Sequence, residues 1–203
     1  MNFKYNTKHL LSGLLMALST SLFAQEENTL GALITDRPDA TESPTAVPKN
    51  SIQVETGAFY ESYEENNFKT ENLTYNTMLM RYGLLENLEL RLGWDYTNNK
   101  TKFNGNEVLS TDSFSPLLLG FKVGIAKEKG VLPEIGFLGH LNLPFSVKKE
   151  LRPENTSVDF RFSFAHTLSE KSSLSYNLGA AWENDAPEAA YLYTIAYGYS
   201  LSR

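Results

Sequence analysis

His140 is the one histidine that falls well inside a regular segment of the sequence, so the search for catalytic chemistry starts there. A serine hydrolase needs a hydroxyl that an imidazole can deprotonate. Ser113 and Ser115 are the serines that a neighbouring strand could place near His140, but no nucleophile motif such as Gly-x-Ser-x-Gly surrounds either. His140 is better explained as a hydrogen-bonded polar residue. We therefore predict that the protein is not an enzyme, with a hydrolase as the alternative.

Metal and cofactor chemistry also has few candidate ligands. The chain has no cysteine, which excludes disulfides and thiolate zinc sites. Beyond the N-terminal segment the histidines are His140 and His166. Glu61, Glu64 and Glu65 could hold a divalent ion loosely, but a solvated acidic loop explains them better. We expect no metal and no cofactor.

The bulk composition predicts one folded domain that does not bind nucleic acid. Of the 203 residues, 41% are hydrophobic and 21% are charged, which argues against wholesale disorder. The formal net charge is −6, and an acidic chain without a basic stripe repels phosphate backbones. No apolar run reaches the roughly 18 residues that a membrane-spanning helix needs.

Residues 1–24 have the three parts of a secretory signal peptide. Lys4 and Lys8 give a positive start, residues 10–22 are mostly apolar, and the small residue Ala24 precedes a polar stretch. This arrangement predicts export, with cleavage near Ala24.

Apolar and polar residues alternate through most of the chain from residue 51 onward. In residues 88–96, three leucines and Trp94 share one face, whereas Glu89 and Arg91 lie on the other. Alternation with period 2 predicts a β-strand with two different faces. Asn76 weakens the pattern in its own segment because it falls among apolar residues. Seven further strands are predicted at residues 52–61, 73–82, 117–125, 131–143, 158–168, 174–182 and 191–201.

The connections between these strands favour a membrane β-barrel. Short turns are predicted at residues 83–87, 126–130 and 169–171, and longer polar loops at residues 63–69, 97–112, 144–156 and 183–188. Short turns at one end and longer loops at the other are typical of outer-membrane barrels. A soluble β-sandwich or a lipocalin-like barrel is the alternative, with its apolar face turned inward. The aromatic residues near the strand ends of the apolar face favour lipid contact: Tyr60, Trp94, Tyr96, Trp182, Tyr191 and Tyr199. We predict an all-β, antiparallel up-and-down transmembrane β-barrel, of which eight strands are visible.

Residues 35–49 carry a more specific pattern. It consists of Thr-Asp-Arg-Pro-Asp at 35–39, Thr-Glu-Ser-Pro at 41–44 and Val-Pro-Lys at 47–49. This pattern resembles the opening of the transporter-like outer-membrane family labelled "putative MetA-pathway of phenol degradation". Arg-Tyr-Gly-Leu at 81–84, Asn-Leu-Glu-Leu-Arg-Leu-Gly at 87–93 and Leu-Asn-Leu-Pro at 141–144 are similar as well.

The resemblance implies a channel or transporter in the cell outer membrane that passes small, often hydrophobic or aromatic compounds. Its partners would be outer-membrane lipid and a small-molecule solute, and the oligomeric state is left open. Family members usually continue for several strands beyond the point where this chain stops. The resemblance therefore implies a barrel of about twelve strands, incomplete here in the domain at residues 51–203, although eight strands could close alone.

Ionisable residues on the polar face are the candidate lining of the barrel lumen. Both signs occur, so we expect no strong single-sign ion filter. One interpretation is a salt-bridged, hydrated interior that stabilises the barrel, and the other is a set of charges that orients a permeating solute. The candidates are Glu55, Glu89, Arg91, Lys122, Glu134, His140, Asp159 and Arg161.

The segment at residues 25–50 is rich in proline and acidic residues, which prevents a regular strand. Its motif comprises Asp36, Arg37, Pro38, Asp39 and Glu42. We predict that it folds back into the lumen as a plug, with Arg37 pairing with Glu55 or Glu89. A disordered periplasmic leader is the alternative. A third function remains open, that of a structural or adhesin-like barrel whose polar loop at residues 97–112 binds an external partner.

Overall fold

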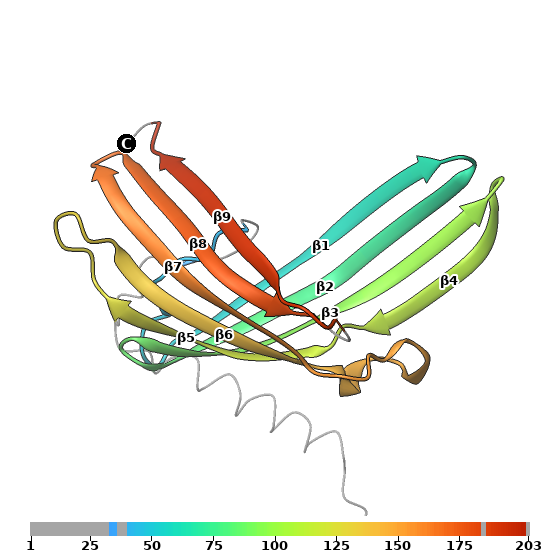
Figure 1. Ribbon diagram of the computed structural model, residues 1–203, viewed down its shortest axis with the longest axis horizontal. Helices are drawn as coiled ribbons and strands as arrows, with labels where there is room; N and C mark the ends of the chain where they lie inside the picture. The colour runs from blue at the N-terminus through green and yellow to red at the C-terminus, as the bar shows by residue number, and fades with distance from the viewer. Residues whose placement is uncertain (1–32, 36–39, 184–185, 202–203) are drawn as a thin grey trace, which may run out of the picture. The chain divides into compact units, whose positions relative to one another are not determined.

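In the described part of the chain, nine β-strands build a single antiparallel sheet, which the computed structural model shows as strongly curled (Figure 1). The structure describes residues 33–35, 40–183 and 186–201. The predicted signal peptide lies outside these ranges. The all-β, antiparallel prediction is confirmed. No helix in the described ranges is long and apolar enough to cross a membrane.

The strands are joined in simple sequential order. Two short 3₁₀ helices, Pro144–Ser146 and Lys149–Leu151, lie in the connection between β6 and β7. The bounds are β1 (Ile52–Glu65), β2 (Phe68–Leu85), β3 (Leu88–Phe103), β4 (Asn106–Phe114), β5 (Leu117–Ala126), β6 (Glu134–Leu143), β7 (Ser157–Ser169), β8 (Ser172–Trp182) and β9 (Ala190–Tyr199).

Strands β4 and β5 together make one interrupted strand alongside β3. Tyr96 of β3 pairs with Phe114 at the end of β4, and Gly93 of β3 pairs with Leu118 at the start of β5. Pro116 lies between the two strands and has no N–H to donate to the ladder. The sheet order β1-β2-β3-β5-β6-β7-β8-β9 therefore matches the eight predicted passes, with β4 as an extension beside β3.

The polar loop predicted at residues 97–112 is wrong, because this stretch is a β-hairpin. Strands β3 and β4 pair through it up to a two-residue turn at Asn104 and Gly105, both with positive φ. The loop predicted at residues 63–69 is likewise a hairpin, and it turns at Asn66 and Asn67. Asparagine and glycine tolerate this left-handed conformation, which two-residue hairpin turns require.

Asn76 marks a β-bulge in β2. Its φ is 54°, and the register between β2 and β3 shifts between Tyr75 and Met78. A bulge inserts one extra residue, so the side chains beyond it change face. The weak alternation around Asn76 is therefore a real feature of the strand.

The two faces of the sheet differ in burial in the reverse sense of a water-soluble fold. Arg81, Glu89 and Lys122 are fully buried on what we call the polar face. Phe162 on the opposite, apolar face is 39% exposed, and Ile195 is 73% exposed. The charged side chains are thus enclosed while the large apolar ones are left accessible.

Candidate functional site

Residues 40–50, here called the strap, cover the polar face. Lys49 forms an isolated parallel β-bridge with Gly83 of β2, and the Asn50 amide donates to the Gly83 carbonyl at 2.8 Å. A Cβ atom on Gly83 would lie 2.0 Å from the Pro48 carbonyl oxygen, and one on Gly136 of β6 would lie 2.6 Å from the Pro44 carbonyl oxygen. Two glycines thus allow the strap backbone to lie directly on the sheet.

The Gly83 contact gives a direct test of the strap's position. Gly83→Ala should destabilise the protein by about 1–3 kcal/mol, the usual cost of overpacking, because backbone atoms of the strap must move. Gly124→Ala is the matched control, since its nearest neighbour would be 3.7 Å away. Urea unfolding in detergent micelles measures both changes, and equal stabilities for the two variants would contradict the contact.

Glu42 joins the strap to both sides of the curled sheet. Its carboxylate accepts from the Arg91 guanidinium of β3 at 2.8 and 3.3 Å, and it lies 3.4 Å from the Lys122 ammonium of β5. The Asn177 side chain of β8 holds the Glu42 main chain, accepting from its N–H at 2.7 Å and donating to its C=O at 2.9 Å. On a flat sheet β3 and β8 would be about 19 Å apart, so the polar face is the concave one.

A second buried ion pair lies beside Glu42. Arg81 of β2 donates to both carboxylate oxygens of Glu89 at 2.8 and 2.9 Å, and to Glu55 of β1 at 3.0 Å. The Val47 amide of the strap donates to Glu89 at 2.7 Å. Arg81 also lies directly opposite Arg91 in the β2–β3 ladder, where like charges are unfavourable. The surrounding carboxylates offset that repulsion.

The eight candidate lining residues fall into two groups on the polar face. The first group contacts the strap or its neighbours and comprises Glu55, Glu89, Arg91, Lys122 and Glu134, whose carboxylate accepts from the Thr45 hydroxyl at 3.1 Å. The second group lies on β6 and β7, in the ladder rows that continue from Arg91 and Lys122. There the His140 Nδ1 atom is 3.1 Å from Asp159, and Arg161 is 3.9 Å from the same carboxylate.

Residues 36–39 of the motif lie outside the described residues, and so does the predicted pairing of Arg37. Of that motif, Glu42 is described and forms the ion pairs given above. Arg81, left out of the candidate list, pairs with both acids proposed for Arg37. Asn177 was missed. An asparagine among small residues does not indicate a binding role in the sequence. What its amide binds is visible only once the strap is folded against the sheet.

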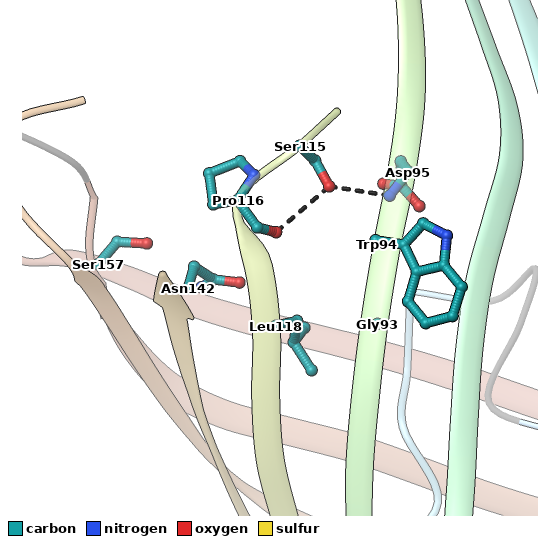
Figure 2. Close-up of a pocket in the computed structure, with 8 residues that line it drawn as sticks. All are labelled: Gly93, Trp94, Asp95, Ser115, Pro116, Leu118, Asn142 and Ser157. Carbon is teal, nitrogen blue, oxygen red and sulfur yellow. Dashed lines mark hydrogen bonds between the residues drawn. The ribbon is translucent and has the colours of Figure 1, made fainter. Parts of the chain in front are cut away.

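A cavity of about 270 Å³ opens beside the second group, between β3, β5 and the ends of β6 and β7 (Figure 2). Asn142 and Ser157 line it and pair directly across the β6–β7 ladder, next to His140 and Asp159. The Ser115 hydroxyl in this cavity accepts from the Asp95 amide at 2.8 Å and donates to the Pro116 carbonyl at 3.3 Å. The cavity walls therefore offer several oxygen acceptors.

The hydroxyls of the two serines weighed as nucleophiles are held by other partners. Ser113 donates to the Phe114 carbonyl and accepts from the Lys148 amide. Ser115 makes the two bonds shown in Figure 2. Among the described residues, no group of three or more histidine, cysteine, aspartate or glutamate side chains could hold a metal ion.

Together these features define a class of protein: an antiparallel β-sheet curled into a half-barrel, with charged residues inside and apolar residues outside. The chain belongs to the family described as "Putative MetA-pathway of phenol degradation", whose model matches residues 35–203. The resemblance seen in the opening motif is thereby confirmed. Comparisons with curated proteins and with solved structures gave no match.

Proposed function

We propose that the protein is an outer-membrane β-barrel channel for small solutes. The observation that carries this proposal is the inverted burial of the sheet, with Arg81 and Lys122 fully buried while Leu90 is 45% and Tyr193 is 83% exposed. Burying one large apolar side chain is worth about 1.5–3 kcal/mol. A sheet face made of such residues is unfavourable in water and favourable against acyl chains.

The strand lengths support the same proposal. Strands β5 to β9 have between 10 and 13 residues, and a tilted strand needs about 9–11 residues to cross the hydrocarbon layer. Strands β1, β2 and β3 are longer, with 14 to 18 residues, and the hairpins β1–β2 and β3–β4 end in polar turns, as expected where strands project into water. Insertion also requires that the edges of β1 and β9 be paired, because lipid does not tolerate unpaired backbone groups.

The polar face supports conduction of solutes that carry polar groups. It combines cations, carboxylates and the cavity beside Asn142 and Ser157. The family description points to phenol degradation, so a small aromatic or otherwise hydrophobic compound is the solute class that we propose. No catalytic role or cofactor enters this proposal.

Reconstitution of the full chain into liposomes tests the channel. Vesicles that contain the protein should swell faster than empty vesicles in an isotonic solution of a small sugar such as arabinose, because the sugar crosses through the lumen. Vesicles that contain protein unfolded before reconstitution are the control. If intact protein inserts but leaves the swelling rate at that of empty vesicles, the channel function is wrong and the scaffold or adhesin alternative gains support.

A further inference from the structure

We propose that Arg91 and Lys122 form a carboxylate-binding site on the polar face, that Glu42 of the strap occupies it in this structure, and that a small carboxylate solute can take the place of Glu42. The inference rests on the proposed function and narrows its solute class to small compounds that carry a carboxylate, and the binding step can be tested without measuring transport.

The site has the geometry that carboxylate recognition requires. Two guanidinium nitrogens of Arg91 contact the two oxygens of Glu42, at 2.8 and 3.3 Å, and the Lys122 ammonium approaches one of them at 3.4 Å. The Arg91 side chain is 1% exposed and the Lys122 side chain is fully buried. A guanidinium fork plus a second cation, both shielded from water, is a strong anion site.

Glu42 differs from Glu55 and Glu89, the other acids of the cluster among the described residues, in its origin. Glu55 and Glu89 belong to β1 and β3, so they are part of the sheet, and both contact Arg81. Glu89 lies farther from Arg91, at 3.6 Å from its Nε atom. Glu42 reaches the site from a segment that lies on the sheet without being one of its strands. The sheet thus presents the cations, and the strap delivers the carboxylate.

A carboxylate that is delivered by a strap can be exchanged for a free one. The main chain of Glu42 is held by Asn177, and Val47 is anchored on Glu89, so the bound carboxylate is tethered at a high local concentration. A free competitor has to overcome an effective concentration in the millimolar range. The intact site should therefore bind solute weakly, and removal of the Glu42 carboxylate should strengthen that binding.

Chemical rescue provides the experiment. We would purify full-length Glu42→Ala in detergent micelles and measure its thermal unfolding in sodium acetate and in sodium chloride at equal ionic strength. Acetate supplies the missing carboxylate. The unfolding midpoint of Glu42→Ala should therefore be about 2–4 °C higher in acetate than in chloride, when the acetate concentration is a few times the dissociation constant of the site. If Glu42→Ala does not fold in chloride, the yield of folded protein in acetate replaces the midpoint as the readout.

Three controls separate this site from a general salt effect. The wild type should not respond to acetate, because Glu42 fills the site. Glu170→Ala, which removes an exposed acid from the β7–β8 turn, should not respond either. The double variant Glu42→Ala with Arg91→Gln should lose the response. An acetate effect that persists in the double variant, or that is absent from Glu42→Ala, overturns the proposal.

Ion selectivity in planar bilayers gives a second readout with a nearly isosteric variant. Glu42→Gln keeps the shape of the strap but removes one negative charge beside two cations, so its reversal potential in a KCl gradient should shift toward anion selectivity relative to the wild type and Glu170→Gln. An unchanged reversal potential in a conducting variant counts against the site. If no variant conducts, the channel function fails, and the acetate experiment alone decides the site.

Discussion

Replacing Glu89 by alanine is expected to destabilise the protein by about 3–5 kcal/mol, the usual cost of breaking a buried ion pair by removing one of its two members. Glu89 is fully buried and accepts from Arg81 through both carboxylate oxygens. It also accepts the Val47 amide of the strap. Its loss therefore leaves a buried guanidinium and a strap N–H without this acceptor at the same time. Urea unfolding in micelles measures the change.

A paired replacement separates the burial of charge from the loss of packing. Replacing Glu89 by leucine together with Arg81 by methionine removes both charges and keeps similar volumes, so part of the lost stability should return, while the Val47 amide and Glu55 still lack these partners. Arg81→Met alone should destabilise, because Glu89 and Glu55 then lose their shared cation. If Glu89→Ala lowers the free energy of unfolding by less than about 1 kcal/mol, as the loss of an exposed ion pair does, then water reaches the cluster and the strap does not exclude it.

The two different faces of the strands could be predicted because apolar and polar side chains alternate along the predicted segments. Around Glu89 and Arg91, every second residue is charged or glycine, and the residues between are apolar. A one-residue shift would place Leu90 and Leu92 on the charged face, so the pattern also fixes the register. The all-β class and the two faces of each strand therefore follow from local sequence, whereas the direction in which the faces point was argued from the aromatic residues near the strand ends.

The hairpin tips could not be predicted in this way. Residues 97–103 and 106–112 are mostly polar, with Phe103, Val108 and Leu109 as the apolar exceptions, so the alternation that reveals a strand is absent even though the backbone pairs along the hairpin. The informative signals were the Asn-Asn and Asn-Gly dipeptides at residues 66–67 and 104–105, whose left-handed turns close hairpins. Turn chemistry, which depends on backbone conformation, was the better guide there than polarity.

The contacts of the strap required the folded chain for a different reason. Its prolines and acids predicted a non-strand segment on the polar face, but sequence separation says nothing about partners. Glu42 meets Asn177, which is 135 residues away, because the curl of the sheet brings β8 over β3. Glu42 lies between the cations because the strap backbone can approach the sheet closely at Gly83 and Gly136.

These buried charges and the exposed apolar face are two consequences of one arrangement. A concave polar face concentrates Arg81, Arg91 and Lys122 within one cluster, and their mutual repulsion is relieved by carboxylates from the sheet and the strap. The convex face then carries the apolar residues and needs an apolar surrounding. The strap thus stabilises the interior by charge, while lipid is expected to stabilise the exterior.

Phe162→Arg tests the exterior directly. Phe162 lies near the middle of β7, is 39% exposed, and packs against Phe137 with ring centroids 5.0 Å apart. In a bilayer an arginine near the midplane of a barrel strand costs about 2–4 kcal/mol, whereas exposed positions of soluble proteins usually tolerate substitution within about 0.5 kcal/mol. We expect the larger loss, measured as unfolding of the protein reconstituted in lipid vesicles.

Two further variants isolate the lipid contribution to that loss. Phe162→Ala removes the same aromatic contact with Phe137 without adding a charge, so the arginine variant should be less stable than the alanine variant in vesicles. Val108→Arg places the same charge on β4, in the hairpin that extends beyond the β3–β5 pairing, where Val108 is 57% exposed. Its stability should stay near that of the wild type, because water rather than acyl chains surrounds that hairpin. Equal stabilities for Phe162→Arg and Phe162→Ala would mean that no hydrocarbon contacts the apolar face at β7, and the membrane orientation would then be wrong.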